Sequence, residues 1–306
     1  MAALTECFKN RYLASLNYYK SFYDDLSEYG NPANTDHAFY FIPGYNGVPG
    51  QIRFALPSIA RYYGSDIYIR CLHLEAFSAK TPVWEKFTKE NIEQKHKAIA
   101  QDLSELDEHF RTITIIVNSS GFYDFKASYD QIPETVKAKS QLAWIACAPD
   151  WMEQSAWENF FYKINGFKHN NYPWFAYPNH NALMVINKEC SATKRWHHGP
   201  QKKTFFKTDL ESRFHFGKLL WDYFSFPSYN WMIQHNVNKS SSPIEIPTVV
   251  LVAEKDGYWW GNSREVIAGV IQKYIPRPKI LYKPTTHLWV TVPEHLSATL
   301  ECLQRN

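Results

Sequence analysis

Two adjacent serines, Ser119 and Ser120, are the residues of this sequence best placed to do chemistry, because they directly follow a segment with the composition of a buried strand. A serine hydroxyl is a weak nucleophile at neutral pH. It needs a neighbouring base, an acid that orients the base, and donors for the developing oxyanion. A tight turn between a strand and a helix supplies that geometry. The same two serines could instead do no more than start a helix, so both interpretations stay open at this point.

The neighbours of the two serines favour one frame over the other. A turn of this kind needs small residues two positions before and two positions after the nucleophile. With Ser119 at its tip those positions hold Val117 and Gly121, whereas with Ser120 the later position holds the bulky Phe122. We therefore favour Ser119 as the nucleophile and keep Ser120 as the alternative.

Short β-branched segments alternate with amphipathic segments on both sides of these serines. Such alternation is typical of βαβ units and predicts an α/β fold with a mostly parallel central sheet flanked by helices. The expected strands lie within residues 37–44, 65–74, 112–117, 140–149, 246–256 and 278–284, and the expected helices within 51–64, 82–110, 263–275 and from about 294.

Two regions depart from this alternation and suggest the domain organisation. Apolar and aromatic residues recur at helical spacing before residue 30 and are followed by a loop rich in Gly, Pro and Asn, so residues 1–36 are expected to form a helical extension. Residues 151–242 hold 21 of the 51 aromatic residues and few aliphatic runs. We expect this segment to be a cap inserted into a core of residues 37–150 and 243–306.

The aromatic residues of the cap permit two interpretations. They could build a small core of their own, since each ring buries a large area. They could also line an apolar pocket above the sheet, where ligands of open α/β proteins bind. On the second interpretation the substrate-binding residues include Trp174, Phe175, Trp221 and Phe224.

Three segments resemble parts of the α/β-hydrolase superfamily. "IPTVVLVAEKDGYW" is similar to the strand and turn that carry the acid of its catalytic triad, which puts Asp256 in that place. "PKILYKPTTHLWVTVPEHLSATLECL" resembles its last strand, histidine loop and final helix, with His287 as the base. "FYFIPGYNGVPG" resembles the glycine-rich turn that supplies an oxyanion-hole amide, here from Tyr45. The order Ser, Asp, His is that of the superfamily.

The resemblance implies a serine hydrolase that needs no cofactor and cleaves an ester or thioester of a fairly apolar acyl group. The second oxyanion donor would be the amide after the nucleophile, from Ser120 or, in the alternative frame, from Gly121. Asp150 is a second candidate for the acid, because some hydrolases carry it after that earlier strand. Val117 and Phe122 depart from the small residues common in the superfamily. A non-catalytic protein of the same fold that binds a small ligand or a protein partner is therefore the alternative function.

Composition limits the other functional classes. The chain has 33 Lys and Arg against 30 Asp and Glu, interleaved along the sequence, so we expect no nucleic-acid partner. No metal-ligand spacing and no membrane-spanning apolar run occur. The N-terminus lacks the features of a signal peptide, and five scattered cysteines suit a reducing compartment, so a cytoplasmic location is expected. The cysteines are Cys7, Cys71, Cys147, Cys190 and Cys302.

Overall fold

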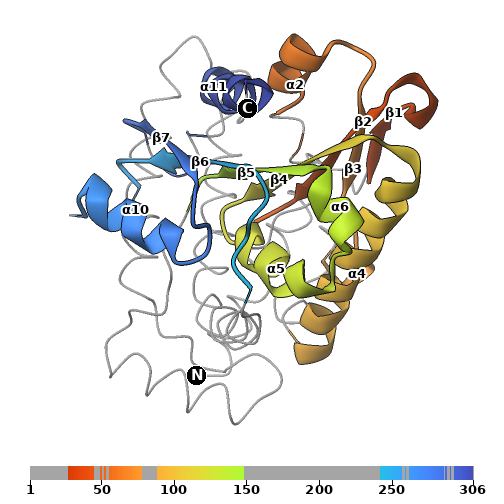
Figure 1. Ribbon diagram of the computed structural model, residues 1–306, viewed down its shortest axis with the longest axis horizontal. Coiled ribbons are helices and arrows are strands. Elements are labelled where there is room, and N and C mark those ends of the chain that lie inside the picture. Colours follow the sequence, from red (N-terminus) through yellow and green to blue (C-terminus); the bar gives the residue numbers. More distant parts are fainter. Residues whose placement is uncertain are drawn as a thin grey trace, which may run out of the picture.

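A seven-stranded sheet forms the centre of the computed structural model (Figure 1), which describes residues 27–44, 49, 52, 55–77, 88–147, 242–256, 259, 262–285, 287, 290 and 293–305. The strands lie in the order β1-β3-β2-β4-β5-β6-β7, and all neighbours are parallel except β1 and β3. Their bounds are β1 Glu28–Gly30, β2 His37–Ile42, β3 Tyr68–Cys71, β4 Thr112–Asn118, β5 Ser140–Ile145, β6 Thr248–Ala253 and β7 Lys279–Lys283.

Helices cover both faces of the sheet, which confirms the α/β class expected from the sequence (Figure 1). One face carries α4 (Lys89–His109), α5 (Gly121–Ser128), α6 (Glu134–Ala138) and α10 (Arg264–Gln272). The other carries α2 (Leu56–Tyr63) and α11 (Pro293–Gln304). Short 3-10 helices occupy Pro32–Asn34, Glu75–Phe77 and Tyr129–Gln131.

The core consists of two apolar layers, one on each side of the sheet, because successive side chains of a strand point to opposite faces. In β2, Tyr40 and Ile42 join the layer under α4 and α5, whereas Phe39 and Phe41 join the layer under α2 and α11. Every residue of β6 is buried. This burial on both faces explains why the strands appear in the sequence as nearly continuous apolar runs.

The chain reverses its direction of winding at β2. From β2 it continues to β3 on one side, and it then returns to β4 on the other side of β2. The connections that follow β2 and β4 therefore leave the sheet in opposite directions at the carboxyl edge of the strands. In open α/β sheets this switch point is where ligands bind, and the two serines follow β4 at this point.

The first strand corrects the sequence analysis. Residues 28–30, where we expected the end of a helix and the start of a loop, form β1, which pairs antiparallel with β3 and adds an edge strand to the sheet. Three residues are too short to give a period-2 pattern. Their conformation depends on pairing with β3, and Gly30 has a positive φ of 84° that favours glycine. The sheet therefore begins before residue 37.

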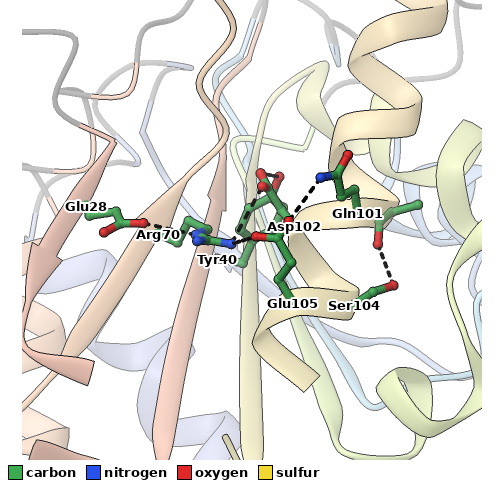
Figure 2. Close-up of polar contacts among 8 residues, drawn as sticks. Glu28, Tyr40, Arg70, Gln101, Asp102, Ser104 and Glu105 are labelled. Atoms are coloured by element: carbon green, nitrogen blue, oxygen red, sulfur yellow. Dashed lines mark hydrogen bonds and ion pairs between the residues drawn. The ribbon is translucent and has the colours of Figure 1, made fainter. Parts of the chain in front are cut away.

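A polar network ties this edge of the sheet to α4 (Figure 2). Arg70 on β3 bonds to Glu28 on β1 at 3.2 Å and to Glu105 on α4 at 2.7 Å. The buried Tyr40 hydroxyl donates to Asp102 at 2.7 Å. Burial and the neighbouring Asp102 raise the pKa of Tyr40 well above its usual value, so this phenol remains a donor. The network holds α4 in register with the strands that it covers.

Among the helices of the described residues, none combines the length and the apolar character that crossing a bilayer requires.

Candidate active site

Ser119 lies at the tip of a tight turn between β4 and α5. Its φ is +51°, a left-handed conformation that is uncommon for a residue with a side chain and costs of order 1–2 kcal/mol. Two hydrogen bonds hold it there: the Ser119 amide donates to the Ile145 carbonyl at 2.7 Å, and the Trp144 indole N–H donates to the Ser119 carbonyl at 3.0 Å. This backbone projects the Ser119 hydroxyl beyond the sheet at the switch point.

Two glycines allow the chain to approach this turn closely. A Cβ on Gly121 would lie 2.6 Å from the Pro43 carbonyl oxygen, and one on Gly44 would lie 2.8 Å from the Asn118 carbonyl oxygen and 3.0 Å from the Ser119 Cβ. A side chain at either glycine would force neighbouring backbone atoms to shift. The loop after β2 and the turn after β4 are therefore in direct backbone contact.

Phe122, a large residue at a position where the sequence analysis noted a departure from a small one, is accommodated by the core. Its ring stacks on Trp144 with centroids 3.7 Å apart and an interplanar angle of 9°. Trp144 thus contacts Phe122 with its ring while its indole N–H holds the Ser119 carbonyl. Val117, the other departure, is fully buried in the same layer.

His287 connects Ser119 to Asp256. Its Nε2 lies 2.9 Å from the Ser119 Oγ, and its Nδ1 is hydrogen-bonded to the Asp256 carboxylate. Since a carboxylate only accepts, Nδ1 carries the proton, and Nε2 is left to accept from the serine hydroxyl. Asp256 is fully buried in the turn after β6, and His287 is 6% exposed. Residues from three distant parts of the chain thus form one hydrogen-bonded array.

Ser120, the alternative nucleophile, makes no hydrogen bond to this array through its hydroxyl. It is 1% exposed, and its hydroxyl finds no hydrogen-bond partner in the described part of the chain. It occupies the N-cap position of α5 with no side-chain bond to the helix, so the capping role considered from the sequence is not realised by its hydroxyl. Of the two serines, Ser119 is the one whose hydroxyl is hydrogen-bonded to His287.

A buried ionic cluster lies one turn into α5, and the sequence analysis did not predict it. Asp124 is fully buried, with Lys95 Nζ 2.5 Å and His96 Nε2 3.3 Å from its carboxylate oxygens. Burial alone would raise the pKa of Asp124, but Lys95 and His96 outweigh it, so the pKa lies below its usual value. Both partners come from the middle of α4, where polar residues in an amphipathic pattern indicate a solvated face.

Several residues expected at the site lie outside the described residues. These are the oxyanion candidate Tyr45, the alternative acid Asp150, and the cap residues Trp174, Phe175, Trp221 and Phe224. Gly121, the other oxyanion candidate, is the first residue of α5.

Other chemistry has little support in the described residues. They contain no group of three or more His, Cys, Asp or Glu side chains suited to a metal ion. Cys147 follows β5 and is fully buried. Burial and the nearby Asp256 raise the pKa of its thiol well above the usual value, so it stays protonated and inert.

Solved structures resemble this fold along nearly the whole chain. A laboratory-evolved variant of potato epoxide hydrolase matches with a TM-score of 0.54 and 12% sequence identity, over 91% of this chain and 95% of the other. The monoacylglycerol lipase of Paleococcus ferrophilus matches with a TM-score of 0.54 and 15% identity, over 90% and 96%. No family model and no curated protein sequence matches. At these identities the likeness shows the fold, and the chain has the α/β-hydrolase fold.

Proposed function

We propose that the protein is a serine hydrolase that cleaves a carboxylic ester or thioester of a fairly apolar acyl group. The observation that carries the proposal is the continuous contact from Ser119 through His287 to Asp256, with the serine on a strained turn at the switch point of the sheet. A buried carboxylate, an imidazole and a hydroxyl in this order provide an acid that orients the base and a base that activates the nucleophile.

Each residue of the array has a role in the proposed reaction. Ser119 Oγ forms a bond to the substrate carbonyl carbon while His287 Nε2 takes the hydroxyl proton. The same proton then passes to the leaving alcohol or thiol, and an acyl-enzyme remains on Ser119. Water, deprotonated by His287, releases the acid and restores the serine. Asp256 fixes the imidazole tautomer and stabilises its charged form.

The oxyanion that develops in each step needs donors already in place. One is the Ser120 amide, which makes no hydrogen bond to another backbone group in the described residues and stands at the N-terminus of α5. The other is the Tyr45 amide, which directly follows Gly44, and the close approach of Gly44 to Ser119 supports this assignment.

The proposal is tested with a fluorophosphonate probe, which labels an activated serine. Wild-type protein should be labelled, Ser119→Ala should not, and Ser120→Ala should be labelled normally, since it removes a hydroxyl that forms no hydrogen bond with described residues. Circular dichroism checks that both variants fold. A panel of p-nitrophenyl esters of increasing chain length then defines the acyl preference.

The alternative is a non-catalytic protein of this fold that binds a small ligand or a protein partner. Its distinguishing result is folded wild-type protein that neither reacts with the probe nor turns over any ester. Labelling that persists in Ser119→Ala but is lost in Ser120→Ala would instead transfer the nucleophile to the second serine.

A further inference from the structure

A small pocket opens beside the proposed nucleophile on the β2–β3 side of the sheet. Its described walls come from the ends of β2 and β3, from the following 3-10 helix and from α4; they include Pro43, Gly44, Leu72, Leu74, Phe77 and Lys95. All but one of these residues are apolar. The exception places a primary ammonium group in an otherwise apolar wall.

Gly44 is the link between this pocket and the reacting atoms. It lines the pocket, and a Cβ built on it would lie 3.0 Å from the Ser119 Cβ. A substrate whose carbonyl carbon contacts Ser119 therefore lies close to Gly44, the residue that borders the pocket. The pocket has room for about one water-sized group, so it can take a single polar atom of a substrate rather than a whole chain, and we assign that atom to the acyl side.

Lys95 has unused hydrogen-bonding capacity. Its ammonium carries three N–H donors. In the described residues it makes one hydrogen bond, to Asp124 at 2.5 Å, and its Nζ lies 4.9 Å from the centroid of the Phe77 ring. Lys95 is only 4% exposed, so bulk water does not readily satisfy the remaining donors. A buried donor without an acceptor is costly, and a ligand that supplies the acceptor recovers that cost.

The charge of the cluster indicates which acceptor fits. Asp124 already lies against both Lys95 and His96, so the ammonium charge is compensated before any ligand binds. A second carboxylate would enter a buried site whose ammonium is already paired with Asp124, and it would lose its hydration. An uncharged ether, hydroxyl or keto oxygen accepts from the ammonium at a much smaller desolvation cost.

We propose that Lys95 determines acyl specificity: its ammonium hydrogen-bonds an uncharged oxygen on the acyl chain, while the apolar wall of the pocket packs against the carbons beside that oxygen. This inference rests on the proposed function and narrows its substrate class. The preferred acyl groups are apolar chains with one oxygen acceptor rather than plain fatty acyl chains.

The test compares esters that differ only in one position. p-Nitrophenyl hexanoate is measured beside analogues in which a single chain CH₂ is replaced by oxygen at successive positions, and each kcat/KM is divided by that ester's rate of alkaline hydrolysis. One oxa position should be favoured over hexanoate by about tenfold or more, as expected for a hydrogen bond to a charged donor. A variant that is merely damaged lowers all esters together and leaves this ratio unchanged.

Two variants assign the preference to Lys95. Lys95→Met keeps the apolar stem but leaves Asp124 less compensated, so it is paired with the double variant Lys95→Met/Asp124→Asn, in which neither charge remains. The ratio should fall to about one in both variants. Asp124→Asn alone keeps the ammonium and should retain a preference for the oxa ester.

Each remaining outcome contradicts the inference in a recognisable way. Equal turnover of hexanoate and all oxa analogues by the wild type, or an unchanged ratio in the folded double variant, overturns it and leaves the proposed hydrolase intact. Faster turnover of a succinate half-ester than of any oxa analogue shows that the acceptor is anionic. Absence of both turnover and probe labelling overturns the proposed function, and this inference with it.

Discussion

The conformation of Ser119 shows how a single residue can be held in a strained state by its neighbours. The positive φ is unfavourable by itself, yet the amide and the carbonyl of Ser119 are both hydrogen-bonded to β5, through Ile145 and Trp144. These bonds leave the side chain free to meet His287. Under the proposed function, this strained backbone presents the nucleophile at the tip of the turn.

Replacing the buried acid tests which carboxylate completes the array. Asp256→Asn preserves the shape of the side chain but favours the wrong imidazole tautomer, so kcat on a good ester should fall by about 10³-fold to 10⁴-fold. Asp150→Asn should leave kcat nearly unchanged, because Asp256 already orients the imidazole. Steady-state kinetics on both variants decides the point, and the opposite ranking would assign the acid to Asp150.

His37 provides a residue-scale prediction about stability. Burial lowers its pKa to about 4. Its Nε2 lies 2.7 Å from the Thr114 hydroxyl, which also accepts from Gln141. Below the ordinary pKa of about 6.5 the unfolded chain binds a proton that the folded chain excludes. The contribution of neutral His37 is therefore complete above about pH 6.5 and is lost as the pH falls towards 4, by up to roughly 3 kcal/mol.

Urea unfolding between pH 7 and 4.5 measures this loss. The free energy of unfolding should fall with decreasing pH more steeply in the wild type than in His37→Gln, which has no imidazole at this position. NMR should show His37 titrating with a midpoint near 4. Parallel pH curves for the two proteins, or a midpoint near 6.5, would contradict the assignment.

At the scale of elements, the contact between the β2 loop and the start of α5 depends on the absence of a side chain. Gly121→Ala would bring a methyl group to 2.6 Å from the Pro43 carbonyl, so α5 or the loop must shift. A displacement of this size near reacting groups should lower kcat/KM by about 100-fold. Denaturation and ester kinetics measure both effects.

Gly269 is the matched control. It lies within α10 with nothing within 4 Å of an added Cβ, so Gly269→Ala should raise the free energy of unfolding by about 0.5–1 kcal/mol through helix propensity, with no change in kinetics. If Gly121→Ala behaved like Gly269→Ala, the close backbone contact would be irrelevant to the reaction.

Periodicity predicted most of the elements because the strands are buried on both faces and the helices are amphipathic. "TITIIV" and α4 are examples: one is a continuous β-branched run, and the other begins at Lys89 after Thr88, whose hydroxyl caps the Asn91 amide. β1 was missed because three residues at an edge depend on their partner strand.

The site was only partly predictable. The order and strand-end positions of the site residues were visible in the sequence. Which serine contacts His287 depends on backbone geometry, and the adjacent serines left that choice open. The cluster of Lys95, His96 and Asp124 joins residues 29 and 28 positions apart, and no local pattern distinguishes a buried lysine from a solvated one. The one indication of this cluster in the sequence was Asp124, a charged residue in the first turn of the helix that follows the predicted nucleophile.

At the scale of the whole molecule, the segment between β5 and β6 is proposed to form a cap over the site. Alanine substitution of one ring at a time among Trp174, Phe175, Trp221 and Phe224 should lower the ratio of hexanoate to acetate turnover by about tenfold for a ring in contact with the acyl chain, since each such contact contributes about 1–2 kcal/mol. The acetate rate should change little. Unfolding by every substitution, with no change of preference, would show that these rings form a core instead.

The separation of Ser119 and His287 along the chain determines when, during synthesis, all residues of the proposed site are present. They are 168 residues apart, and His287 follows β7, the last strand to emerge during synthesis. Synthesis proceeds from the N-terminus, and a domain generally folds as a unit. A nascent chain complete only through β5 holds the serine but lacks both its base and its acid. Under the proposed function, a product that lacks this C-terminal segment cannot attack an ester, and probe labelling recovers during refolding only after the segment has docked against the Ser119 turn.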